Sequence, residues 1–174
     1  MSTQPGVRPD PAFGLLELYD EALPHVYGYL LARCADRAVA EDLTAETFLA
    51  AVDAARKPDA PPLSVSWLIG VARHKLADHW RREERQQRRQ RRLETDHEPS
   101  VDPWDVELDV MVARDVLASL GAHHRLALTL RYLDGLPVPE VAAHLERTVH
   151  ATEALLVRAR TAFRKEYTRE EGRS

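Results

Sequence analysis

Residues 66–92 read SWLIGVARHKLADHWRREERQQRRQRR, and this stretch indicates the fold class of the chain. Its first half spaces apolar side chains three and four residues apart, the period of an amphipathic helix, at Trp67, Leu68, Val71, Leu76 and Trp80. Its second half is made of charged and amide side chains. Ser64 or Ser66 is available to cap the start of the helix. The pattern predicts one long helix that is apolar along its first half and strongly basic at its end.

Two more helices are predicted before this stretch. The first covers residues 13–34, where Pro24 is expected to bend or split it. The second covers residues 38–55 and turns Leu43, Phe48, Ala51, Val52 and Ala55 inward and Glu41, Asp42 and Glu46 outward. Three prolines make residues 57–64 a loop, and residues 1–12, with three prolines and a glycine, are expected to be disordered.

After the basic stretch, residues 93–107 form a polar, acidic linker, and helical periodicity returns near Trp104. One apolar stripe contains Leu108, Met111, Val112, Val116, Leu117 and Leu120 and stops at Gly121. The next helix holds Leu126, Leu130 and Leu133 and ends at Asp134-Gly135. Two more helices cover residues 138–145 and 148–167, the last burying Leu155, Leu156, Ala159 and Phe163. The expected fold is all-α, with small helical domains at residues 13–92 and 108–168 and a tail at residues 169–174.

The net charge of −4 hides an uneven distribution of charge along the chain. Residues 1–60 have 5 basic and 10 acidic side chains, residues 61–92 have 9 and 3, and residues 93–120 have 1 and 8. Cys34 is the only cysteine, so no internal disulfide or thiolate zinc cluster is available. The sequence shows no membrane-spanning run and no signal peptide. These features favour a cytoplasmic protein that binds nucleic acid through its basic segment.

Residues 136–160, LPVPEVAAHLERTVHATEALLVRAR, have the layout of a helix-turn-helix unit. Ala142 and Ala143 permit a close crossing of two helices, and Thr148 is a candidate N-cap of the second. The start of that second helix would reach base edges in the major groove, with the arginines farther along contacting phosphates. The candidate base readers are Thr148, Val149, His150, Ala151 and Glu153, and the candidate phosphate contacts are Arg158, Arg160 and Arg164. A pair of antiparallel core helices with a solvated face is the alternative.

The basic block interleaves cations with two tryptophans, which suits a nucleic-acid strand. Arginines neutralise phosphates, and an aromatic face can stack on an unpaired base. The alternative is that both tryptophans are core residues and that the arginines form a solvated face. We favour a core position for Trp67, beside Leu68 and Val71, and nucleic-acid binding for the arginines.

Two parts of the chain resemble the extracytoplasmic-function (ECF) sigma factors of bacterial RNA polymerase. The first part is FGLLELYDEALPHVYGYLLARCADRAVAEDLTAETFLAA (residues 13–51) with SWLIGVARHKLADHWRR (residues 66–82), which resembles region 2. The second is LASLGAHHRLALTLRYLDGLPVPEVAAHLERTVHATEALLVRARTAFRK (residues 117–165), which resembles region 4. AEDLTAETF (residues 40–48) and the WLxxxARxKLxDxxRR pattern are the specific signals, because a helix-turn-helix alone is common.

The resemblance implies a sigma factor without enzymatic activity or cofactor, whose partners are the polymerase core (β′ clamp helices and β flap), promoter DNA and an anti-sigma factor. The implied polymerase-binding residues are Glu41, Asp42, Leu43, Glu46, Thr47 and Phe48. The implied −10 DNA-binding residues are Ser64, Trp67, Arg73, His74, Lys75, Asp78, Arg81 and Arg82, with residues 58–63 as a loop that captures a flipped base. The implied −35 DNA-binding residues are Arg125, Thr148, Val149, His150, Ala151, Glu153 and Arg158. The acidic linker would follow the path of nascent RNA.

The chain departs from the family pattern mainly in its second domain. Glu146 replaces the turn glycine, and Glu153 and Ala154 replace the common Lys and Ser of the recognition helix. Leu155 stands where an Arg is frequent, Leu120-Gly121-Ala122 replaces Leu-Pro-Pro, and His74 in the first domain replaces Asn. These changes remove positive charge from the recognition helix, so its contact with DNA is expected to be atypical.

Two other classes of protein compete with this interpretation. A metal-dependent enzyme would use His74, Asp78 and His79 or the His123-His124 pair, but no further ligand has matching spacing. A helix-turn-helix regulator that acts without polymerase would not need AEDLTAETF or an aromatic single-strand site. Failure to bind core polymerase would favour the regulator, and a stoichiometric bound metal would favour the enzyme.

Overall fold

The computed structural model describes residues 11–34, 36–90 and 109–172, and every regular element in these ranges is helical. The all-α fold class is therefore confirmed. The helices form two compact units, which divide between Leu76 and Ala77 inside the long helix α3 (Val65–Gln90). The predicted linker at residues 93–107 and most of the predicted disordered N-terminus lie outside the described residues. In the described ranges no helix has the length and apolar character that crossing a membrane requires.

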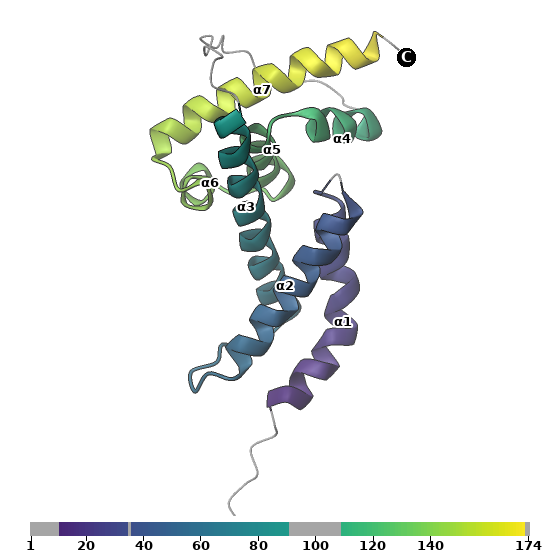
Figure 1. The fold of residues 1–174 in the computed structure, drawn as a ribbon, viewed down its shortest axis with the longest axis vertical. Helices are drawn as coiled ribbons and strands as arrows, with labels where there is room; N and C mark the ends of the chain where they lie inside the picture. The colour runs from purple at the N-terminus through teal and green to yellow at the C-terminus, as the bar shows by residue number, and fades with distance from the viewer. Residues whose placement is uncertain (1–10, 35, 91–108, 173–174) are drawn as a thin grey trace, which may run out of the picture. The chain divides into compact units, whose positions relative to one another are not determined.

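The first unit begins with α1 (Pro11–Leu31) and α2 (Arg37–Ala55), which lie side by side in Figure 1. Pro11 stands at the first helical position, where its missing N–H costs no hydrogen bond. Helix α1 continues through Pro24, so the expected split does not occur. Asp36 caps α2, because its Oδ1 accepts a hydrogen bond from the backbone N–H of Ala38 (2.8 Å).

The core of the first unit comes from one side of each of its helices. The buried residues include Ala22, Val26 and Leu30 of α1, Leu43, Phe48 and Ala51 of α2, and Leu68, Ala72 and Leu76 of α3. The rings of Tyr19 and Phe48 meet with centroids 4.7 Å apart. Two buried threonines satisfy their hydroxyls locally: Thr44 donates to Ala40 O and Thr47 donates to Leu43 O, both at 2.7 Å. The three helices thus share an apolar interior without an unpaired hydroxyl at these two threonines.

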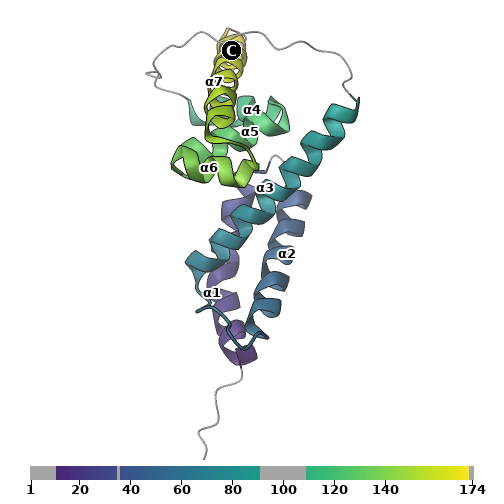
Figure 2. The ribbon, with the colours of Figure 1, turned by 90° about the vertical axis from the view of Figure 1, so that its left-hand side faces the viewer.

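The second unit contains α4 (Val110–Ser119), α5 (Ala122–Leu128), the wide turn η1 (Thr129–Leu133), α6 (Val138–Leu145) and α7 (Val149–Glu171). Figure 2 shows the short helices gathered along α7. The core cluster consists of Val116, Leu120, Leu128, Ala159, Phe163 and Tyr167. The Tyr167 hydroxyl also accepts a hydrogen bond from the backbone N–H of Asp109 (2.9 Å), which ties the start of α4 to the end of α7. Helix α7 therefore organises this unit.

The helix predicted to hold Leu126, Leu130 and Leu133 changes its geometry after Leu128. In η1 the hydrogen bonds span five residues, as from Asp134 N–H to Thr129 O (3.0 Å). The wider turn rotates the following side chains, so Leu130 is fully buried whereas Leu133 is 53% exposed. The prediction that Leu133 shares the stripe of Leu126 and Leu130 is wrong, because it assumed regular α-helical spacing.

Candidate functional site

Helix α2 presents an acidic face with an apolar centre. Asp42, Glu46, Leu49 and Asp53 follow one another at spacings of four, three and four residues, which places them on one side of the helix. All four are exposed or half-exposed, and Leu49 has 64% of its surface exposed. An exposed leucine surrounded by carboxylates is typical of a contact surface for a cationic partner.

Three of the residues assigned to polymerase binding belong to the core instead of this face. Leu43 and Phe48 are buried, and Thr47 is fully buried. The resemblance assigns Thr47 to polymerase binding, but its position four residues after Leu43 puts it on the inner side, where its hydroxyl donates a hydrogen bond to Leu43 O. These three residues pack in the core of the first unit. The exposed residues of α2 are the ones that a partner could contact.

Glu41 and Leu49 complete the description of α2. Glu41 is exposed and accepts a hydrogen bond from Arg37 Nε (2.7 Å), which raises the pKa of Arg37 above its ordinary value. The sequence interpretation missed Leu49 as a contact residue. The signal was present in the helical spacing of Asp42, Glu46 and Leu49, which groups an apolar residue with two outward carboxylates.

Helix α3 aligns the predicted −10 residues. Ser64 is the N-cap, because its Oγ accepts a hydrogen bond from the backbone N–H of Trp67 (3.2 Å). Helical spacing puts Trp67, His74, Asp78 and Arg82 on one side. We favoured a core position for Trp67, but its side chain is only half-buried. Trp80, in contrast, is buried. This side of α3 therefore holds an aromatic ring, an imidazole, a carboxylate and one guanidinium.

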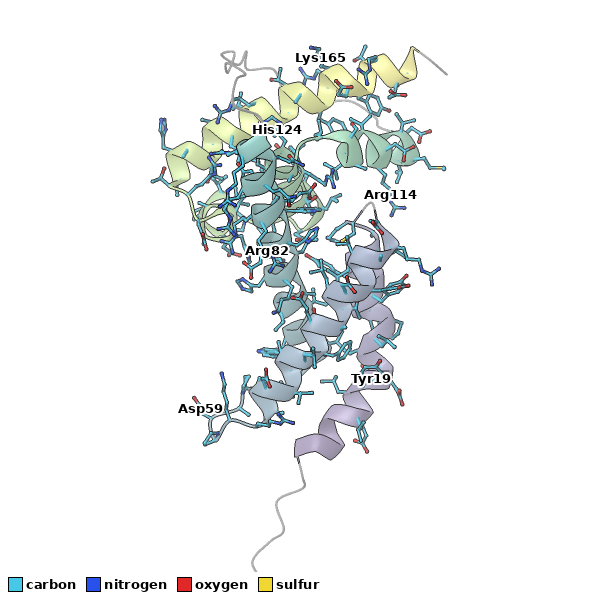
Figure 3. All side chains as sticks on the ribbon, in the orientation of Figure 1. Tyr19, Asp59, Arg82, Arg114, His124 and Lys165 are labelled. Carbon is cyan, nitrogen blue, oxygen red and sulfur yellow. The ribbon has the colours of Figure 1, made fainter. Side chains whose placement is uncertain are left out.

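The flanks of this surface are Arg73, half-buried on one side, and Lys75 on the other. Lys75 Nζ lies 3.5 Å from Glu46 Oε2 of α2. The loop before α3 is largely exposed, and Figure 3 shows Asp59 on this loop and Arg82 on α3. In the first unit, the candidate −10 residues thus comprise an exposed loop, a half-buried tryptophan and the flanking Arg73 and Lys75.

Ion pairs neutralise part of the basic charge of α3. In the second unit, Arg81 contacts the carboxylates of Asp78 and Glu146. Glu84 lies 2.7 Å from Arg88 Nη2 and 3.2 Å from Arg147 Nη2. Arg81 must exchange carboxylates for phosphates if it binds DNA.

The helix-turn-helix predicted for residues 136–160 is present as α6, a tight turn and α7. Glu146 makes the turn in the left-handed region, with φ of 54° and ψ of 43°. The backbone N–H of Arg147 donates to Ala142 O (3.0 Å), and Thr148 Oγ1 accepts from the N–H of Ala151 (3.1 Å). Thr148 is therefore the predicted N-cap, which fixes where the second helix begins.

The exposed face at the start of α7 holds Val149, His150, Glu153 and Ala154. Ala151 is half-buried at the edge of this face, and Leu155 is buried. Most of the predicted −35 residues are therefore brought together. Arg158, half-buried, is the first arginine of α7 and lies a turn beyond Glu153.

The guanidinium of Arg125 forms hydrogen bonds with the backbone at the end of α4 and does not join the exposed face of α7. Its Nη2 donates to Leu120 O (3.0 Å) and also to Ala118 O. Ala118 lies in the last turn of α4 and Leu120 is its C-cap, so helix geometry leaves no intrahelical donors for these carbonyls. Arg125 thus closes the end of α4, a role that the sequence interpretation did not foresee.

No cluster of three or more His, Cys, Asp or Glu side chains suited to a metal ion occurs within residues 11–34, 36–90 and 109–172. His74 and Asp78 lie one turn apart on α3, but Asp78 is paired with Arg81.

Two family models match the chain, one to each half. Sigma-70 region 2 matches residues 18–86, and Sigma-70 region 4 matches residues 111–163. Together they span α1 to α3 and α4 to α7, and they include the candidate residues described above.

Curated relatives give the same result over longer alignments. The ECF RNA polymerase sigma factor BldN of Streptomyces coelicolor is 31% identical over 159 residues, which cover 85% of this chain and 57% of BldN. The probable RNA polymerase sigma-C factor of Mycobacterium bovis is 31% identical over 149 residues, covering 85% of this chain and 80% of the relative. The chain thus spans little more than half the length of BldN but most of the sigma-C factor.

A solved structure shares the fold. It is the sigma factor RpoE from Bartonella quintana, in complex with the anti-sigma factor NepR. The TM-score is 0.52 at 19% identity, covering 89% of this chain and 97% of the other. At this identity the likeness supports the helical fold alone.

Proposed function

The chain belongs to the ECF sigma factors of the sigma-70 family, which bind core RNA polymerase and direct it to promoters, and we propose how its surfaces divide this work. The acidic face of α2 docks on the basic clamp helices of the β′ subunit, with Leu49 at the centre of the contact. The outer side of α3 and the loop before it bind the melted −10 strand. The start of α7 reads the −35 duplex, and the second unit meets the β flap.

The observation that supports this division is the separation of charge within the first unit. Asp42, Glu46 and Asp53 face outward from α2, whereas Arg73 and the half-buried Trp67 lie on the part of α3 that belongs to this unit. Carboxylates attract a basic protein surface and repel DNA, so α2 favours polymerase over promoter. Cations and an aromatic ring favour a single strand, which supports our assignment of the −10 element to α3.

The remaining assignments follow from the family. The protein acts in the cytoplasm, beside core polymerase, without catalysis of its own and without a cofactor. An anti-sigma factor is expected to regulate it, as one is bound to RpoE in the related structure. The alternative, a regulator that acts without polymerase, does not account for the match of residues 18–86 to region 2.

Transcription reconstituted with core polymerase tests the proposal. Replacing Arg81 and Arg82 together by Ala should reduce promoter opening, measured by permanganate reactivity of −10 thymines, while core binding remains. The matched control replaces Arg88 and Arg89, which lie in the last turn of α3, and removes the same charge. Equal opening by both double variants would contradict the placement of the −10 strand. A chain that leaves core polymerase inactive at every promoter would contradict the function itself.

A further inference from the structure

The start of the recognition helix α7 is unusual for a DNA-reading surface in its charge. Residues 148–157 contain no Lys or Arg, and Glu153 is their one carboxylate. Glu153 is exposed on the same face as Val149, which is 43% exposed, and His150. A helix that enters the major groove here presents an acceptor instead of the cations that usually contact guanine.

Glu153 also differs from the other glutamates of the site in having no partner that would hold it away from DNA. Glu41, Glu46, Glu84 and Glu146 each form an ion pair. Within the described ranges, no ion pair or side-chain hydrogen bond occupies the carboxylate of Glu153. Both of its oxygens are available to accept hydrogen bonds from a base.

Glu153 lies in the part of α7 whose side chains contact base edges in helix-turn-helix proteins. Thr148 caps α7, and Glu153 follows it by five residues, one turn into the helix. Side chains in the first turns of a recognition helix contact bases, whereas those farther along contact the backbone. The cations of α7 begin at Arg158, which suits the phosphates that flank the contacted base.

The major groove offers a carboxylate one good partner. Cytosine presents its N4 amino group, which donates a hydrogen bond. Guanine presents N7 and O6, both acceptors that repel a carboxylate, and thymine presents O4, a further acceptor. Adenine presents an N6 amino group beside the acceptor N7, so one oxygen of the carboxylate would gain a bond while the other is repelled.

We propose that Glu153 makes this sigma factor select a cytosine in its −35 element, through a hydrogen bond from cytosine N4 to the carboxylate. This inference rests on the proposed −35 role of the second unit and specifies which base that unit requires. The absence of Lys and Arg from residues 148–157 is then part of the selectivity, because it leaves none of the cations that most often contact guanine.

The test is run-off transcription by reconstituted holoenzyme on a promoter library with a randomised −35 region and a fixed −10 element, read by sequencing. The wild type should enrich cytosine at one −35 position by about tenfold, in the range of a good base contact. Glu153→Gln should shift the preference at that position to adenine, because an amide pairs with N6 and N7. Glu153→Lys should shift it to guanine.

Glu140→Gln is the matched control, since Glu140 is an exposed carboxylate in the first turn of α6. It should leave the preference for cytosine unchanged. Identical −35 preferences in the wild type and both Glu153 variants would overturn the inference, as would a wild type with no preference for cytosine. In either case, transcription that still depends on the −10 element would leave the proposed function standing, whereas no promoter-directed transcription would refute that function.

Discussion

Lys75 of α3 and Glu46 of α2 form an ion pair, with Nζ 3.5 Å from Oε2. Lys75 is assigned to the promoter and Glu46 to the polymerase, so the pair joins the two proposed surfaces of the first unit. Both side chains are partly exposed, and such a pair stabilises the fold by less than about 1 kcal/mol. A cation of the polymerase that engages Glu46 would therefore release Lys75 for a phosphate at little cost in stability.

Exchanging the two charges separates stability from function. The double variant Glu46→Lys with Lys75→Glu keeps an ion pair at this position, so its unfolding free energy in urea should stay within about 0.5 kcal/mol of the wild type. Its affinity for core polymerase, measured by fluorescence anisotropy, should fall, because a cation now stands on the acidic face of α2. Retention of full core affinity would remove Glu46 from the docking surface.

Substitution of Leu49 should affect core binding and not stability, whereas substitution of Leu43 should affect stability. Leu49→Ala removes an exposed side chain, so it should weaken core binding by about 1 kcal/mol or more, roughly fivefold, with little change in stability. Leu43→Ala removes a side chain that is only 2% exposed and should destabilise the first unit by about 2–5 kcal/mol. Denaturant unfolding and core binding, measured on both variants, check these expectations. Unchanged core binding by Leu49→Ala would show that the apolar centre of the α2 face is not a contact.

The fold was predictable where local chemistry determines it. The bounds of α6, Val138–Leu145, match the prediction, because Pro139 fits only a first helical turn and the turn at Glu146 follows directly. The cap at Thr148 was predictable for the same reason. The wide turn η1 was not, because Thr129–Leu133 has the apolar spacing of an ordinary α-helix and the packing of the second unit determines its geometry.

The candidate site was predictable in its residue types but not in its contacts. The charges of Glu46 and Lys75 indicated two different partners, and only the packing of α2 against α3 shows that they pair. The resemblance assigns Arg125 to −35 DNA, yet the carbonyls that it binds are those of Ala118 and Leu120 at the end of α4. A sequence pattern places a side chain on a helix face, and neighbouring elements then determine what it contacts.

Arg125 should act as a structural residue in experiments that separate stability from DNA binding. Arg125→Met leaves the partly buried carbonyls of Ala118 and Leu120 without this donor, so the second unit should lose about 1–3 kcal/mol of stability. The salt dependence of promoter binding by the holoenzyme should be unchanged.

Arg158→Met is the comparison for Arg125→Met. It removes a proposed phosphate contact, so the slope of log affinity against log salt should become shallower by about 0.9. If Arg125→Met also made the slope of log affinity against log salt shallower, Arg125 would have to be counted among the DNA-binding residues.

Glu146 occupies a backbone conformation that favours glycine, with φ of 54° and ψ of 43°. For a residue with a Cβ this region costs about 1–2 kcal/mol, and the greater freedom of glycine in the unfolded chain offsets about half of the gain on substitution. Glu146→Gly should therefore stabilise the turn by up to about 1 kcal/mol. The readout is hydrogen exchange of the Arg147 amide, which donates to Ala142 O (3.0 Å) and should exchange up to about fivefold more slowly.

Glu146→Gln separates the backbone effect from the charge. It keeps the left-handed conformation and its cost but removes the carboxylate that contacts Arg81. Exchange of the Arg147 amide should then be no slower than in the wild type. If Glu146→Gln protects this amide as much as Glu146→Gly does, repulsion by the carboxylate and not backbone strain limits the stability of the turn.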